Sequence, residues 1–261
     1  MDKLRDWDEL LRPLEAPADK RTLIELVQKA GEKILTHYEI RLGNLTIEPL
    51  RVEAYLYKAG CFEDKFVHKG KGKENEVYGP RQRNRFGELY IHSGYGGVDI
   101  VLSRCETYAF SFLLKNSRIL RNDEIIYPFV KQIQLAKILK EQGIPIDYHE
   151  KVLYRKAKPN ETIVFKTVRN GLSKIVERPD FRKAEQNEFN TLLISFFIEL
   201  KEHTSRDFGF ETGFGGDRAV VEYLKDYRAM HPEVGIDELD RIRKELYPNG
   251  SKSEFKKEFE K

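Results

Sequence analysis

The feature that most constrains the fold is the segment from Leu45 to Tyr57, in which apolar side chains alternate with polar or aromatic ones. One set comprises Leu50, Val52, Ala54 and Leu56, and the other comprises Arg51, Glu53, Tyr55 and Tyr57. Successive side chains of a β-strand point to opposite faces of its sheet. The segment is therefore predicted to be a strand with one face on the core and with Glu53 on the other face. Gly43-Asn44 predicts a hairpin turn from a preceding strand over residues 39–42.

The rest of the chain mixes strand and helix patterns. Further strands are expected over residues 89–92, 98–103, 110–114, 152–156 and 162–169. Apolar residues at helical spacing predict helices over residues 22–36, 127–142, 180–204, 219–231 and 237–246. Residues 251–261 are charged and low in apolar content, so we expect them to be frayed.

The composition is typical of a soluble globular protein, with 40% apolar and 34% charged residues in a chain of 261. No run approaches the roughly 18 consecutive apolar residues of a membrane span. The first residues are charged, so a secretory signal is not expected. Cys61 and Cys105 are too few for a disulfide framework or a thiolate metal site. A cytoplasmic location and no membrane partner are therefore expected.

A strongly basic segment follows the alternating one, although the net charge of the whole chain is only +3. Its cations are Lys65, Lys69, Lys71, Lys73, Arg81, Arg83 and Arg85, against the anions Glu74 and Glu76. Such a local excess of positive charge is suited to contacts with phosphates. The alternative is an ordinary solvated loop.

Ionisable and aromatic side chains also occur on the strands that follow. Tyr90 and His92 alternate with Leu89 and Ile91, and Asp99 lies between Val98 and Ile100. If the strands pair in simple register, Tyr90, His92 and Asp99 share a face with Glu53. Asp99 is then a second carboxylate beside the first; otherwise it is a turn residue after Gly97. For Glu53 the alternative is a surface carboxylate paired with Arg51, and for the tyrosines it is ordinary packing.

The order of several short motifs resembles the methylpurine (3-methyladenine) DNA glycosylase family. These motifs are Arg51-Val-Glu-Ala-Tyr-Leu, His68, Arg83-Asn-Arg, Gly87-Glu-Leu-Tyr-Ile-His, Tyr95-Gly96 and Leu113-Leu-Lys. The resemblance covers residues 51–118 and is that of a divergent member, because His92 stands where the family has a stacking tyrosine. It implies an α+β fold with a curved, mainly antiparallel sheet flanked by helices. Residues 1–175 would form the glycosylase-like core, and residues 176–261 a helical extension packed on it.

The resemblance also implies a function in base excision repair: hydrolysis of the N-glycosidic bond of a damaged or modified base flipped out of duplex DNA. Glu53 would be the catalytic base that activates water. The substrate-binding side chains would be Tyr55, His68, Tyr90, His92, Tyr95 and Asp99, with Tyr95 as the wedge that fills the gap in the duplex. The backbone contacts would come from Lys65, Lys69, Arg81, Arg83 and Arg85. No cofactor or metal is expected, and the protein would act as a monomer.

Three other interpretations remain open from the residues alone. Glu53, His68, His92 and Asp99 could form a two-histidine metal site, although their spacing matches no metal motif. A nucleophile at Ser103 or Cys105 is disfavoured, because neither lies in a recognisable turn motif. The third is a non-catalytic nucleic-acid-binding or sensing module that keeps the fold and the pocket.

Overall fold

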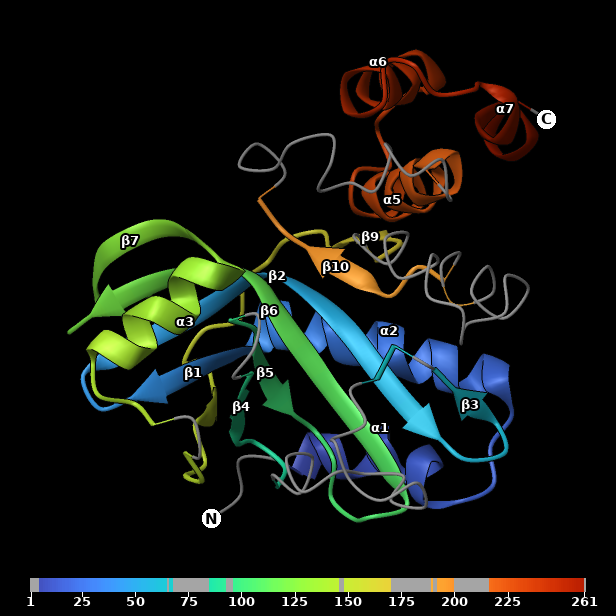
Figure 1. The fold of residues 1–261 in the computed structure, drawn as a ribbon. Coiled ribbons are helices and arrows are strands. Elements are labelled where there is room, and N and C mark those ends of the chain that lie inside the picture. Colours follow the sequence, from blue (N-terminus) through green and yellow to red (C-terminus); the bar gives the residue numbers. More distant parts are fainter. Residues whose placement is uncertain are drawn as a thin grey trace, which may run out of the picture. The chain divides into compact units, whose positions relative to one another are not determined.

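The computed structural model describes residues 5–64, 66–67, 85–92, 96–145, 148–169, 189, 192–199 and 216–260 (Figure 1). The chain divides into two compact units, residues 1–161 and 162–261. The boundary predicted from the sequence, after residue 175, lies outside the described residues.

The first unit is built on a curved antiparallel sheet (Figure 1). Its strands run in the order β4-β5-β6-β2-β1-β8, with β3 paired to β2 and β7 paired to β6. The bounds are β1 Tyr38–Leu42, β2 Leu45–Lys58, β3 Phe62–Glu63, β4 Leu89–Ile91, β5 Val98–Val101, β6 Tyr108–Arg121, β7 Glu124–Lys131 and β8 Leu153–Arg155. With helices on the sheet and more in the C-terminal region, the fold class is α+β, as predicted.

Two helices, α1 (Arg5–Glu15) and α2 (Lys20–His37), precede the sheet, and α2 packs against β2. The predicted helix over residues 22–36 is confirmed. It begins slightly earlier, because the side chain of Asp19 accepts a hydrogen bond from the backbone N–H of Thr22 and caps the helix. The side chains of Leu50, Val52, Ala54 and Leu56 on β2 are buried, as the alternation predicted.

The segment after β6 differs from its prediction. Asn122 and Asp123 both have positive φ, as a tight hairpin turn of the primed type requires. They return the chain into the strand β7, and only then does the helix α3 (Gln132–Glu141) begin. The predicted helix over residues 127–142 was therefore wrong in its first part. Ile125, Tyr127 and Phe129 lie at every second position, as in a strand. The pairing of this segment with β6 outweighs the weak helical spacing of its apolar residues.

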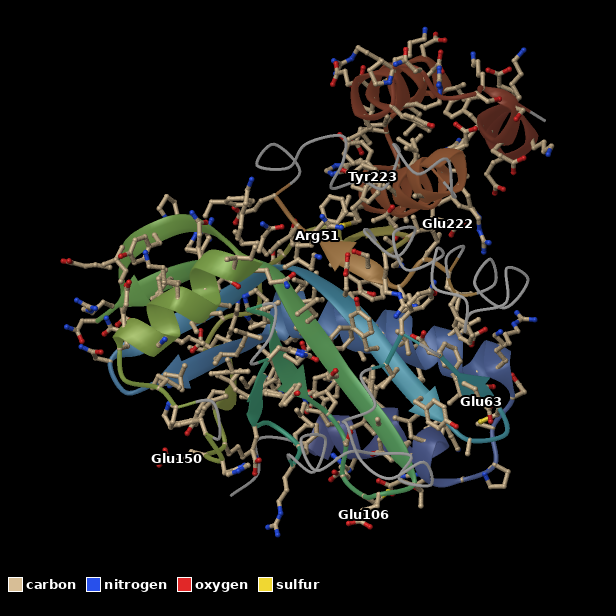
Figure 2. All side chains as sticks on the ribbon, in the orientation of Figure 1. Arg51, Glu63, Glu106, Glu150, Glu222 and Tyr223 are labelled. Carbon is tan, nitrogen blue, oxygen red and sulfur yellow. The ribbon has the colours of Figure 1, made fainter. Side chains whose placement is uncertain are left out.

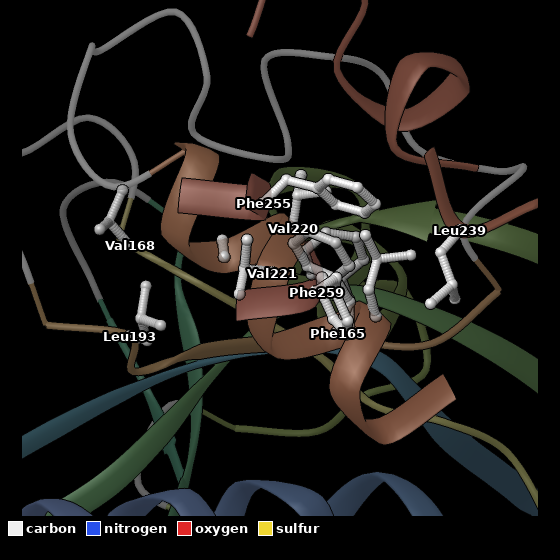
Figure 3. Packing of buried hydrophobic residues seen from close by; sticks show 11 residues of the cluster. Phe165, Val168, Leu193, Val220, Val221, Leu239, Phe255 and Phe259 are labelled. Carbon is white, nitrogen blue, oxygen red and sulfur yellow. The ribbon is translucent and has the colours of Figure 1, made fainter. Parts of the chain in front are cut away.

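The second unit has a strand pair and three helices: β9 (Phe165–Thr167), β10 (Ser195–Phe197), α5 (Gly216–Met230), α6 (Ile236–Leu246) and α7 (Ser253–Phe259). They enclose an apolar core that includes Phe165, Phe197 and Phe255 (Figure 3). The predicted helix over residues 180–204 was wrong where β10 lies, because aromatic residues in that apolar run favour a strand.

The C-terminal residues also differ from their prediction. The expected frayed tail contains the helix α7, and Phe255 and Phe259 of this helix are buried in the core of the second unit. Two aromatic rings four positions apart lie on one helical face, and this gives a short charged helix an apolar side to bury.

Candidate functional site

Four neighbouring strands place polar and aromatic side chains in one row across the sheet. Glu53 of β2 pairs with Leu113 of β6, Leu113 pairs with Asp99 of β5, and Asp99 pairs with Tyr90 of β4. Residues directly opposite one another on paired strands point to the same face. His92 lies two residues beyond Tyr90 and contacts Asp99, so it shares that face. The expectation that Tyr90, His92 and Asp99 share a face with Glu53 is confirmed, whereas their roles stay predictions.

Glu53 is completely buried, and both of its carboxylate oxygens have partners. Arg51 Nη2 donates to Oε1 at 3.3 Å, and the Tyr55 hydroxyl donates to Oε2 at 3.3 Å. Lys115 Nζ lies 3.5 Å from Oε2. The alternative of a surface carboxylate paired with Arg51 is right about the pair and wrong about the surface, since Glu53 is 0% and Arg51 is 1% exposed (Arg51 is labelled in Figure 2).

An irregularity in the pairing of β2 with β6 shapes this cluster. The register shifts between Pro49 and Arg51 and again between Arg51 and Val52, so that Arg51 pairs with Asn116 and Val52 with Leu114. Proline has no N–H to donate to the ladder, and strands bulge at such positions. The shift leaves Lys115 of β6 without a pairing partner on β2, and its ammonium reaches Glu53.

A second polar cluster surrounds Asp99. The Ser111 hydroxyl donates to Asp99 Oδ2 at 3.0 Å, and His92 Nε2 lies 3.2 Å from Asp99 Oδ1. The rings of Tyr90 and His92 meet edge to face, with centroids 4.5 Å apart. Asp99 is therefore a strand residue in the same row as Glu53, with Leu113 of β6 between them, and not a turn residue after Gly97.

Aromatic and apolar side chains flank the Glu53 cluster at one end. Tyr57, Val67 and Ala109 form a small apolar cluster, and Tyr55 packs against it. Burial raises the pKa of the Tyr57 hydroxyl, and the nearby Glu63 carboxylate raises it further. Glu53 thus contacts two cations and the hydroxyl of Tyr55, and Tyr55 in turn packs against the apolar cluster.

Several predicted residues cannot be placed. Lys65, His68, Lys69, Arg81, Arg83 and Tyr95 lie outside the described residues. Arg85 is described and is exposed to solvent, as a phosphate contact requires.

Within the described residues, which do not include His68, the geometry supports neither a nucleophile at Ser103 or Cys105 nor a metal site. The Ser103 hydroxyl hydrogen-bonds the backbone of Phe110 as both donor and acceptor, which is a structural use. Cys105 is exposed and contacts the hydroxyl of Thr107. Across the described parts of the chain, no three histidine, cysteine or carboxylate side chains gather closely enough to hold a metal ion.

Sequence reasoning missed Ser111 and Lys115, which complete the two clusters. Ser111 is the one hydroxyl in the apolar segment from Phe110 to Leu114, and this interruption was the available signal. The role of Lys115 depends on the register shift beside Pro49, and a proline inside a predicted strand was the available signal.

No protein-family model matches this chain, and no curated protein matches it. Within the described residues, no helix combines the length and the apolar character needed to cross a membrane. What the fold and the site define is an α+β protein with two carboxylates, a histidine and tyrosines on one face of a curved sheet.

Proposed function

We propose that this chain is a DNA glycosylase-like enzyme that hydrolyses the N-glycosidic bond of a flipped damaged or modified base. The observation that carries the proposal is the row in which four strands align Glu53, Asp99 and Tyr90, with His92 beside Asp99. The motif order that resembles methylpurine glycosylases also supports it, because Glu53, Tyr90 and His92 belong both to those motifs and to this face.

The proposed chemistry assigns Glu53 to the sugar side of the bond. Its carboxylate orients the attacking water and takes a proton from it as the new C–O bond forms, and it stabilises positive charge on the sugar while the base leaves with the electron pair of the broken C–N bond. A buried carboxylate persists in an interior only when it is compensated, and Arg51 and Lys115 provide that compensation. Hydrolysis of this kind needs only water, so we propose no metal or cofactor.

The base must leave the helical stack before it can be cut from its sugar. Enzymes that flip a base hold it between aromatic or apolar side chains, at a cost of a few kcal/mol for unstacking. Tyr55 and Tyr90 are the described side chains that would hold it, with His68 and Tyr95 as further predicted members. Phosphate contacts fall to Arg85 and the other cations of the basic segment. The proposed partner is duplex DNA, bound by a monomer.

The test is an excision assay on duplexes that each carry one alkylated, deaminated or bulky modified base, followed by alkaline cleavage of abasic sites. The wild type is expected to produce strand breaks on at least one substrate. Glu53→Gln is expected to lower the rate by about 10²–10⁴, the range for loss of a general base. Strand breaks that never exceed those of Glu53→Gln, on every substrate, would contradict the proposal.

Glu48→Gln is the matched control. Glu48 lies on the same strand and pairs with two cations, Arg118 and Lys156, but it is outside the row. Both variants are melted first and assayed well below their melting temperatures, because each leaves cations without their carboxylate partner. A general loss of folding would lower the activity of both variants, whereas a catalytic role lowers only that of Glu53→Gln.

A second candidate function is a non-catalytic module that binds or senses nucleic acid. It is favoured by one observation: both oxygens of Glu53 already have protein partners, as expected of a structural carboxylate. Binding of duplex or single-stranded nucleic acid that survives Glu53→Gln, with no released product, would identify this function.

A further inference from the structure

Asp99 is a buried carboxylate with an unused hydrogen-bonding capacity. Its side chain is 9% exposed, and Oδ2 accepts the hydrogen bond from Ser111. Oδ1 accepts no hydrogen bond within the described structure: His92 Nε2 is 3.2 Å away, but the geometry is not that of a hydrogen bond. Leaving a buried acceptor without a donor is costly, so such an atom in a folded protein calls for a reason.

The position of Asp99 relative to Glu53 suggests that reason. The two residues lie on strands separated only by β6, with Leu113 between them in the row. Neighbouring strands are about 4.8 Å apart, so the two backbones are separated by about 10 Å. The row therefore presents a carboxylate, an apolar side chain and a second carboxylate, in an order that suits a sugar, the flat ring of a base and the far edge of that base.

We infer that Asp99 Oδ1 accepts a hydrogen bond from an N–H group on the far edge of the excised base. This inference rests on the proposed function and names its substrate class: bases that carry an exocyclic amino group on that edge, in preference to bases that carry an oxo group at the same position. An ionised carboxylate can only accept hydrogen bonds. An oxo group would bring a second acceptor against it, in an interior where unpaired polar groups are expensive.

Ser111 acts as a positioning residue in this arrangement. Its hydroxyl donates to Oδ2 and fixes the orientation of the carboxylate, which leaves Oδ1 as the oxygen that can accept a further hydrogen bond. His92 lies against Oδ1 and limits the directions from which a base can approach it.

The test uses pairs of duplexes whose modified bases have the same shape and differ on one edge, where one member carries an exocyclic amino group and the other an oxo group with a ring N–H beside it. One pair is an adenine-type and a hypoxanthine-type base with the same alkyl substituent; the other is hydroxycytosine and hydroxyuracil. Sites built to hydrogen-bond a substrate N–H reject analogues without it by up to about 10⁴–10⁵. The full-length wild type is therefore expected to excise the amino member of a pair at least about 10²-fold faster than the oxo member.

Asp99→Asn is the decisive variant, because it keeps the shape of the side chain. Its amide oxygen can accept the Ser111 hydroxyl, and its NH₂ then faces the base as a donor. The amino-to-oxo rate ratio is expected to fall to about one or below. Ser111→Ala is the second variant and should lower the ratio partly. Glu88→Gln is the control, since Glu88 is a buried carboxylate near His149, outside the row, and this variant should keep the wild-type ratio.

Binding measured with Glu53→Gln separates this inference from the proposed function. If the wild type excises nothing but the Glu53→Gln protein binds amino-bearing duplexes more tightly, and Asp99→Asn removes that preference, the glycosylase proposal fails and the role of Asp99 stands. If excision occurs with equal rates on both members of each pair, or with a ratio that Asp99→Asn leaves unchanged, the inference is overturned and the glycosylase proposal stands. If the protein shows neither excision nor a binding preference, both the glycosylase proposal and the inference are overturned.

Discussion

The two compact units of this chain each bury an ion pair, but to different depths. The second unit surrounds an apolar core of aromatic and aliphatic residues, and its buried pair Asp240–Arg243 is also contacted by the more exposed Lys244 and Lys252. The first unit buries Arg51 and Glu53 almost completely on one face of its sheet. Replacing a buried ion pair by well-packed apolar residues is often neutral or stabilising. The deeper burial of Arg51 and Glu53 is therefore the physical reason why we propose a function for this face.

The largest effect on stability is expected from removing Arg51, one partner of the buried pair in the first unit. Arg51→Met leaves a buried carboxylate with one fewer cation, so the free energy of unfolding is expected to fall by about 3–5 kcal/mol. The double variant Arg51→Met, Glu53→Leu removes both charges and is expected to recover most of that loss while losing function. Chemical denaturation of both proteins measures the difference. A double variant as unstable as the single one would mean that the pair is needed for folding.

A somewhat smaller loss of stability is expected from truncating a residue in the apolar core of the second unit. Phe255 is fully buried there, with its ring centroid 5.0 Å from that of Phe259. Phe255→Ala is expected to cost about 3 kcal/mol through lost burial and a residual cavity. The exposed Ile236→Ala, in the same unit, is the control for apolar truncation without a cavity. Thermal melting that shows no difference between the two variants would contradict the assignment of this core.

Asp240 and its three cationic partners in the second unit are expected to give a smaller, pH-dependent contribution to stability. Burial tends to raise the pKa of Asp240, but hydrogen bonds from Arg243, Lys244 and Lys252 outweigh burial and hold it at about 2. A carboxyl group whose pKa is lower in the folded state stabilises the fold above its ordinary value near 3.8, and loses that contribution as the pH falls toward 2. Denaturation between pH 5 and 2 should show a decline on the order of 1 kcal/mol that Asp240→Asn removes. An equal decline in Asp240→Asn would assign it to other groups.

The smallest expected effect concerns Arg85. If Arg85 contacts a phosphate, Arg85→Ala should lower the slope of log binding constant against log salt concentration by about 0.9 on duplex DNA. Arg21→Ala is the control, because Arg21 is an exposed cation on α2 that is already paired with Glu25. A slope equal to that of the wild type would remove Arg85 from the interface.

The sequence was informative where a periodic pattern determines structure. Strict alternation predicted β2 and the separate faces of its side chains, and short alternating segments predicted the shared face of Tyr90, His92 and Asp99. It was uninformative where long-range pairing decides. The Ser111–Asp99 bond depends on the register of β5 with β6, and the Lys115–Glu53 contact depends on a shift beside Pro49.

Tertiary packing also outweighed local pattern in two places. The apolar run around Ser195–Phe197 fits a helix or a buried strand by periodicity alone, and pairing with β9 decides for the strand. The charged tail forms α7 because Phe255 and Phe259 find a core to pack into.

The central proposal is that the buried carboxylate of Glu53 takes part in the excision reaction. The most direct test is the single-turnover rate constant for excision by the wild type, Glu53→Gln and Glu48→Gln, on the modified duplex that the wild type cuts fastest. We expect a rate constant lower by about 10²–10⁴ for Glu53→Gln and one close to the wild type for Glu48→Gln. Equal rate constants for the wild type and a folded Glu53→Gln protein would contradict it.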